Sequence, residues 1–292
     1  MYTDSSGTVR KLKEDIINMQ NLHTHTTYVD GTLTPEEMIE YAIKTGIDSL
    51  GFSEHSYVTF DENYAMSPDE THRYINELRN LKDIYQSVIE IFIGLEVDYY
   101  TVWKPKTGLD YIIGTSHYIE AIDSNGKALY PSIDSGAVRQ KEIVDLYFNG
   151  DFYSMAEKYF STITNIVQIT GADIIGHFDL VTKYNFNNSL FDENHPRYIK
   201  AALDAMEAIL EHCNIFEVNT GAMFRFQKPE PYPSEFLLKE LFKRGGEVIL
   251  GSDSHNGQSL CYKFDEMTDL LKYCGFKYQK RLTDKGFIDI AL

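Results

Sequence analysis

Short, continuously apolar runs rich in Ile and Val alternate along the chain with longer segments whose apolar residues recur at helical spacing. Runs without polar alternation are typical of strands that are buried on both faces of a parallel sheet. Seven such strands are predicted, at residues 16–23, 48–53, 89–95, 109–114, 172–176, 215–219 and 248–252.

The segments between these strands carry helix signals. Thr34 is expected to cap a helix that has Pro35 at its first position and Glu37 in a capping box, and Gly46 then ends it. Further helices are predicted at about 68–85, 153–170, 196–212, 235–245 and 264–273.

Strand and helix alternate seven times, and no Gly- or Ser-rich linker divides the chain. We therefore predict an α/β fold with one barrel domain of about seven βα units at 16–292, preceded by an N-terminal tail at 1–15. Residues 118–150 are too long for an ordinary connection and are predicted to form a flap over the mouth of the barrel.

Composition limits the classes of partner. The 292 residues carry a formal net charge of −17 without a basic run, so we expect no nucleic-acid partner. No apolar run reaches the roughly 20 residues that span a bilayer, and residues 1–7 lack the apolar core of a secretory signal. The three cysteines, Cys213, Cys261 and Cys274, form no paired motif, which favours a cytoplasmic location.

Potential metal ligands follow the predicted strands. Because the carboxyl ends of barrel strands converge on one mouth, these side chains are expected to meet there. A single histidine at a strand end is more often a hydrogen-bonded structural residue, but a whole set is hard to explain in that way. The set comprises His23, His25, His55, Glu96, His117, His177, Asp253 and His255.

The ligand types indicate the chemistry. Imidazole and carboxylate without thiolate suit zinc, manganese or iron in catalytic sites. The number of ligands exceeds what one ion needs, so we expect two or three divalent ions. Clustered ions of this kind suit the hydrolysis of phosphate esters.

The same segments resemble the motifs of the PHP (polymerase and histidinol phosphatase) superfamily, and within it those of the monofunctional histidinol-phosphate phosphatases. The resemblance implies a distorted (β/α)7 TIM-like barrel with a trinuclear metal site at the carboxyl ends of the strands. The motifs are His-x-His at 23–25, Asp-Gly at 30–31, Ser-Glu-His-Ser at 53–56, Gly-Leu-Glu-Val-Asp at 94–98, Gly-Thr-Ser-His-Tyr at 114–118, Gly-His-Phe-Asp-Leu at 176–180 and Gly-Ser-Asp-Ser-His at 251–255.

Carried over motif by motif, the resemblance implies three ligand groups. Asp30 has the clearest alternative to a role as metal ligand, because Asp-Gly is also a common turn sequence. The groups are His23, His25, Glu96 and Asp253 for the first ion, Glu96, His117 and His177 for the second, and Asp30, His55 and His255 for the third.

The resemblance also implies a catalytic set of Asp253, His255 and Arg225, with Arg225 following a Glu-x-Asn-Thr run at 217–220. Arg225 is expected to clamp phosphate, although the segment Gly-Ala-Met-Phe before it departs from the family pattern and an exposed arginine is the alternative. Arg139 and Tyr118 are further candidates for substrate binding. Glu120, Asp123 and Asp179 are candidates to receive a positively charged group, and Asp179 alternatively to support a histidine ligand.

The implied function is hydrolysis of L-histidinol phosphate to L-histidinol and phosphate, in histidine biosynthesis. The alternatives are a PHP phosphatase for another small phosphate ester, a nuclease, or a PHP domain that binds metal without catalysis. The expected partner is a small-molecule phosphate ester, with no membrane and with the oligomeric state left open.

Overall fold

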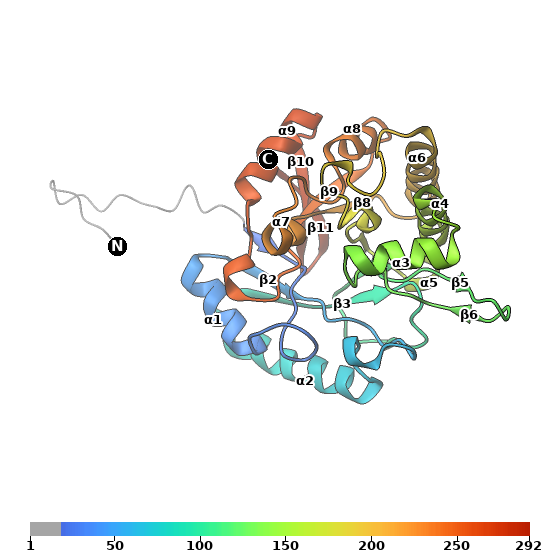
Figure 1. Cartoon of the computed structure of the whole chain (residues 1–292). Coiled ribbons are helices and arrows are strands. Elements are labelled where there is room, and N and C mark those ends of the chain that lie inside the picture. Colours follow the sequence, from blue (N-terminus) through green and yellow to red (C-terminus); the bar gives the residue numbers. More distant parts are fainter. Residues whose placement is uncertain (1–18) are drawn as a thin grey trace.

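The computed structural model describes residues 19–292 and has seven parallel strands that curl into a nearly closed barrel (Figure 1). The strands follow one another around the barrel in the order β1-β2-β3-β4-β7-β8-β9. This confirms the α/β barrel predicted from the apolar runs. The bounds are β1 Gln20–Asn21, β2 Ser49–Phe52, β3 Glu90–Asp98, β4 Tyr111–Thr115, β7 Ile174–Ile175, β8 Ile215–Asn219 and β9 Glu247–Gly251.

The seam between the first and last strands closes just beyond their ends. Thr24 and Ser254 form a parallel bridge. The backbone N–H of His25 donates to the Ser254 carbonyl at 2.8 Å, and the Ser254 N–H donates to the His23 carbonyl at 3.0 Å. The first and last strands of the barrel are therefore joined at the residues that carry the His-x-His pair.

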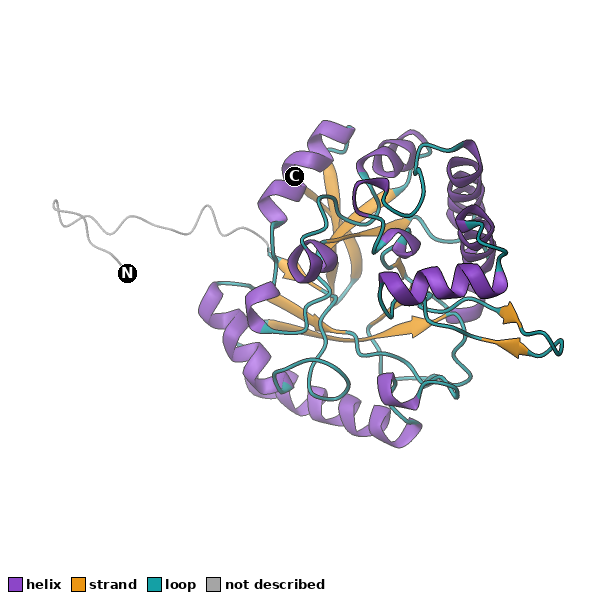
Figure 2. Ribbon diagram, viewed as in Figure 1, coloured by secondary structure: helices purple, strands orange, loops and turns teal. Residues whose placement is uncertain are grey.

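Helices surround the barrel (Figure 2), and several start as their sequences predict. Thr34 and Glu37 form the expected capping box of α1, and Ser67 and Glu70 form another at the start of α2. The segment predicted as one helix at 153–170 is two, because the chain leaves helical geometry at Asn165. The helices are α1 Pro35–Thr45, α2 Pro68–Tyr85, α3 Ala137–Tyr147, α4 Phe152–Ile163, α5 Ile166–Thr170, α6 Pro196–Leu210, α7 Gly221–Phe226, α8 Glu235–Lys243 and α9 Phe264–Cys274.

An antiparallel hairpin that the sequence analysis did not predict packs at the amino end of the barrel. Its strands are β10 (Tyr278–Thr283) and β11 (Gly286–Ala291). Leu282 joins the buried side chains inside the barrel, among them Leu22. The Gln20 side chain accepts a hydrogen bond from the Leu282 N–H and donates one to its carbonyl, so the hairpin closes the end of the barrel opposite the metal-ligand residues.

Residues 118–150 contain a second hairpin, β5 (Ala121–Ile122) with β6 (Ala128–Leu129), and helix α3. The hairpin projects from the body of the molecule in Figure 1. Helix α3, in contrast, packs on the body of the molecule through the buried side chains of Ile143 and Val144. The flap and the single domain at 16–292 stay predictions. The predicted tail at 1–15 and the start of the first strand lie outside the described residues. None of the described helices is long and apolar enough to cross a membrane.

Candidate metal centre

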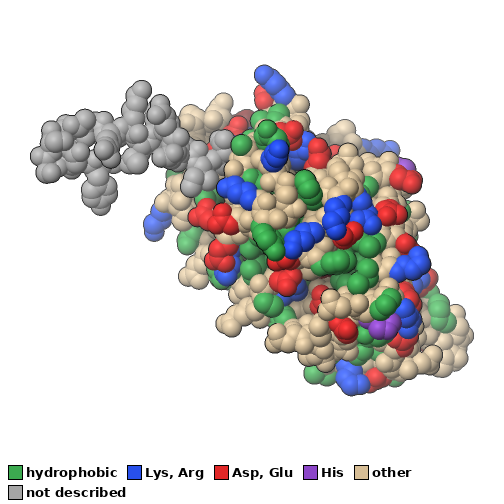
Figure 3. All heavy atoms as spheres, turned by 90° about the horizontal axis from the view of Figure 1, so that it is seen from above, with side chains coloured by type: hydrophobic (Ala, Val, Ile, Leu, Met, Phe, Trp, Pro, Cys, Tyr) green, Lys and Arg blue, Asp and Glu red, His purple; other side chains and the backbone are tan. Residues whose placement is uncertain are grey.

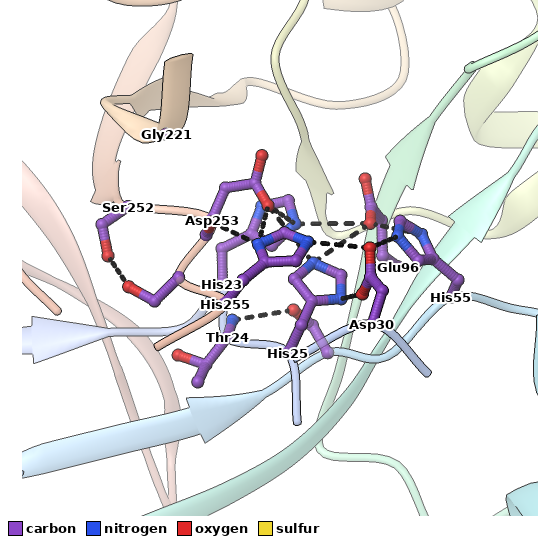
Figure 4. A network of polar contacts seen from close by, with 12 residues as sticks. His23, Thr24, His25, Asp30, His55, Glu96, Gly221, Ser252, Asp253 and His255 are labelled. Atoms are coloured by element: carbon purple, nitrogen blue, oxygen red, sulfur yellow. Dashed lines mark hydrogen bonds and ion pairs between the residues drawn. The ribbon is translucent and has the colours of Figure 1, made fainter. Parts of the chain in front are cut away.

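The nine predicted ligands meet at the carboxyl end of the barrel. Seven of them, drawn in Figure 4, point toward one another from separate strand ends and loops. Short apolar strands fix the backbone below each ligand, so the polar side chain that follows is delivered to the mouth. The ligands are His23, His25 and Asp30 after β1, His55 after β2, Glu96 within β3, His117 after β4, His177 after β7, and Asp253 and His255 after β9.

Glu96 lies at the centre of this cluster. Its Oε1 is 2.7 Å from Nε2 of His177 and 3.3 Å from Nε2 of His117. Its Oε2 is 2.8 Å from Nδ1 of His55 and 3.4 Å from Nε2 of His23. Because Oε2 is also 3.5 Å from Nε2 of His25, one carboxylate faces five imidazoles, an arrangement suited to a ligand shared between ions.

A second group lies beside it. Ligand atoms of His25, Asp30, His55 and His255 all lie within 4.8 Å of one another. Asp30 Oδ2 is 3.0 Å from Nε2 of His255, and the rings of His25 and His255 stack with centroids 4.4 Å apart. The structure therefore brings Asp30 to the histidines predicted to share its ion, and adds His25 to that neighbourhood.

Asp253 links the two groups. Its Oδ1 is 3.3 Å from Nε2 of His25 and 3.8 Å from Nε2 of His23. Asp253 also adopts a left-handed backbone conformation, with φ at 46°, which is uncommon for a residue other than glycine. Asp253 lies two positions after the end of β9, and its carboxylate faces the imidazoles of His23 and His25.

Several of these ligand atoms are buried without a hydrogen-bond partner among the described residues. They include Nε2 of His23, both ring nitrogens of His25 and Oδ1 of Asp30. A buried polar atom without a partner costs roughly 1–3 kcal/mol. A divalent ion would accept these lone pairs, so the residues fit a metal cluster.

Two ligand histidines are held by carboxylates behind them. Glu217 Oε1 is 2.7 Å from Nδ1 of His23, and Asp98 Oδ2 is 3.2 Å from Nδ1 of His117. Such contacts fix the tautomer and leave Nε2 free to bind metal. The sequence analysis missed both roles, although Asp98 lies two positions after Glu96 and so shares its face of the strand.

Charge keeps the central carboxylates ionised. Burial alone would raise the pKa of Glu96, but His55, His117 and His23 hold the pKa well below its usual range. Burial would also raise the pKa of Asp253, but Arg225 and His23 hold this pKa well below its ordinary value. Both side chains are therefore anionic at neutral pH, the form in which a carboxylate can bind a metal ion.

A pocket of about 340 Å³ opens beside the cluster. Arg225 and Tyr118 line it, as do the ligands Asp30, His55 and His255. Arg225, on α7, donates from Nη2 to Asp253 Oδ2 at 2.7 Å and from Nη1 to the Asp253 carbonyl at 2.6 Å. The departure of residues 221–224 from the family pattern therefore does not take Arg225 away from the cluster.

The structure does not bring Arg139 to this pocket. Its side chain lies on α3, is about half exposed and pairs with Glu142 at 2.9 Å, so its role in substrate binding stays a prediction. Glu120 pairs with Lys158 at 3.0 Å, and Asp123 accepts backbone hydrogen bonds within its own turn.

Asp179 lies behind the site. Its Oδ2 accepts a hydrogen bond from the Ser234 N–H at 3.2 Å, and burial raises the pKa of its carboxyl to about 7. The contacts that the structure gives its side chain are to this backbone and not to a ligand histidine. The structure thus supports neither of the roles considered for Asp179.

Comparison with known proteins is consistent with this site. The family model "PHP domain" matches residues 21–221. A relative from Schizosaccharomyces pombe named "Probable histidinol-phosphatase" is 28% identical, over 82% of this chain and 81% of its own. The "Histidinol-phosphatase" of Bacillus subtilis is 25% identical, over 83% and 96% of the two chains.

A solved structure has a similar fold. The histidinol phosphate phosphatase of Lactococcus lactis, complexed with zinc, L-histidinol and phosphate, superimposes with a TM-score of 0.66. The alignment covers 93% of this chain and 99% of that one at 19% identity.

Proposed function

Since the chain belongs to the PHP domain family, we propose that it is a metal-dependent phosphomonoesterase that hydrolyses L-histidinol phosphate to L-histidinol and phosphate. The observation that carries the proposal is the convergence of nine imidazole and carboxylate side chains, with Glu96 at their centre, beside a pocket that Arg225 lines. The curated relatives named histidinol-phosphatase, which match over most of the chain, support the choice of ester.

We propose two to three divalent ions, of zinc, manganese or iron, in the ligand groups described above. When bound, such ions supply Lewis acidity toward phosphoryl oxygens and lower the pKa of a coordinated water. The proposed groups are His23, His25, Glu96 and Asp253, then Glu96, His117 and His177, then Asp30, His55 and His255, with His25 close to the last group as well.

The protein's own groups position the reactants. Glu217 accepts the Nδ1 proton of His23 and so presents Nε2 toward Glu96 and Asp253. Arg225 has five N–H donors, and its contacts with Asp253 and with Nδ1 of His255 hold the guanidinium at the pocket. We propose that its remaining donors bind phosphoryl oxygens, which complements the negative charge of the ester.

A polymeric nucleic-acid substrate fits the chain poorly. The net charge is −17, and on the face drawn in Figure 3 Lys and Arg side chains are interspersed with Asp and Glu. A small phosphate ester is therefore the proposed substrate. A role in histidine biosynthesis in the cytoplasm, which agrees with three free cysteines, belongs to the same proposal.

Steady-state phosphatase kinetics after reconstitution with manganese, zinc or iron test this function. We expect L-histidinol phosphate to be hydrolysed with a higher kcat/KM than phenyl phosphate, glycerol phosphate or a nucleoside monophosphate. Equal rates on all esters would contradict the proposed substrate. Absence of turnover on every ester by the metal-loaded protein would contradict the proposed reaction.

A further inference from the structure

Five carboxylates line the pocket, and four of them face a side chain that carries or can carry positive charge. The charge of each of these four carboxylates is therefore already paired, either within the metal-ligand cluster or in an internal ion pair. The four pairs are Asp30 with His255, Asp98 with His117, Asp134 with Lys183, and Asp253 with Arg225.

Asp61 is the fifth, and its partner is neutral. Among the described residues, its side-chain contact is with Tyr118, whose hydroxyl donates to Oδ2 at 2.8 Å. A carboxylate that faces a pocket without a cationic partner keeps its full negative charge available to a ligand. Asp61 therefore differs from every other acid that lines this pocket.

Aromatic side chains hold this wall in place. The Phe60 ring meets the Tyr118 ring edge-on, with centroids 4.8 Å apart, and stacks on Tyr130 at 4.9 Å. Tyr118 is itself buried and packs with Val58. The pocket thus presents the Asp61 carboxylate beside the Tyr118 ring, which is a favourable surface for an organic cation.

The rest of the pocket suits a phosphate. Arg225 lies in the lining together with the ligands His55 and His255. A ligand that occupies the pocket from the metal-ligand side to the wall at Asp61 would need a negative end and a positive end. The volume of the pocket, about 340 Å³, is within the usual range for small-molecule sites, about 300–1,000 Å³.

We infer that Asp61, positioned by Tyr118, receives the positively charged nitrogen of the substrate and sets a preference for phosphate monoesters of cationic alcohols. The inference rests on the phosphatase function proposed above. It assigns a substrate contact to a residue of the loop after β2, whereas the sequence alone suggested Glu120, Asp123 or Asp179.

The test compares two esters and two variants. Asp61→Asn removes the charge at nearly constant shape, and no helix-capping hydrogen bond is lost, because the Asp61 side chain makes none. Tyr118→Phe removes only the hydroxyl that orients Asp61. Asp269→Asn, at an exposed position of α9, is the matched control for loss of one charge.

For Asp61→Asn we expect kcat/KM on L-histidinol phosphate to fall by about 10- to 100-fold, the usual range for a lost charge-assisted contact. The loss on phenyl phosphate, which has no cationic group, should stay below about 3-fold, so the ratio of the two values is the readout. Tyr118→Phe should lower the same ratio less, because the carboxylate remains. Calorimetric titration of the metal-loaded protein with L-histidinol should show affinity weakened by a similar factor in Asp61→Asn.

The possible results separate the role of Asp61 from the phosphatase function itself. A ratio that does not change, or changes as much in Asp269→Asn, would overturn the inference while phosphatase activity stands. If the wild-type protein hydrolyses no ester, the proposed function fails. The titration with L-histidinol then still tests whether Asp61 contributes to binding. L-Histidinol that binds Asp61→Asn as well as wild type, or fails to bind wild type, would overturn the role of Asp61.

Discussion

The Nδ1 atom of His23 lies 2.7 Å from Oε1 of Glu217, and both side chains are buried. Glu217 belongs to β8, which is separated from β1 by β9 around the barrel. The contact leaves Nε2 of His23 facing Glu96 at 3.4 Å. Glycine at 251 makes room for it, because a Cβ there would collide with the Glu217 carboxylate.

We expect Glu217→Gln to weaken metal binding about 10-fold, because the neutral amide holds the His23 tautomer less firmly than the carboxylate does. Equilibrium dialysis followed by elemental analysis measures the change. Glu211→Gln, at an exposed position at the end of α6, should bind metal as wild type does. Equal affinity in Glu217→Gln would show that the contact does not tune the ligand.

His23→Ala should lose bound metal and phosphatase activity together, because Nε2 of His23 lies near both Glu96 and Asp253. Elemental analysis and phosphate release on one preparation give the two quantities. His212→Ala, at an exposed position just after α6, is the matched control. Full metal content with full turnover in His23→Ala would refute the proposed ligand role.

Arg225→Lys should lower kcat/KM by roughly 100-fold, since a lysine keeps the charge but loses the planar array of donors. Arg225 contacts both the carboxylate and the carbonyl of Asp253, so part of the loss arises from a less fixed Asp253. Arg73→Lys, on the exposed face of α2, should leave the rate unchanged. A wild-type rate in Arg225→Lys would exclude the proposed phosphate contact.

Asp179 should make the protein less stable as the pH rises. Burial raises the pKa of its carboxyl from 3.8 to about 7, so the folded state binds a proton between these values that the unfolded state has released. The free energy of unfolding then falls across this window by up to roughly 4 kcal/mol.

Asp179→Asn removes this dependence, so its stability relative to wild type should increase from pH 4 to pH 8. Urea unfolding at several pH values measures the difference. Asp269→Asn should follow wild type at every pH. A parallel course for Asp179→Asn and wild type would show that Asp179 is ionised at the same pH in the folded and unfolded states.

Local chemistry explains what the sequence could predict. The strands are short and apolar enough to require burial on both faces, and every predicted ligand except Asp30 lies at the end of such a run or within three residues after it. Helix α1 begins at Pro35 because Thr34 and Glu37 cap it. These signals lie within a few residues of the feature that they predict.

The features that escaped prediction depend on distant partners. Tyr118 meets Asp61 across 57 positions of sequence, and no periodic pattern marks the loop that carries Asp61. The hairpin β10–β11 alternates weakly in polarity, and its place is fixed by contacts such as that between Leu282 and Gln20, which are 262 positions apart. Helix α7 has no side-chain cap at Thr220 that would reveal its start.

The bridge between Thr24 and Ser254 also has a consequence for biosynthesis. The His-x-His pair is synthesised well before Asp253 and His255, which lie more than 200 positions further along the chain. Since β1 and β9 can meet only after both have been made, the nascent chain holds an incomplete set of predicted ligands until His255 has been added. Stable loading of the proposed metal cluster would therefore follow the synthesis of His255, and the free metal pool that the chain meets from then on would decide which ions it captures.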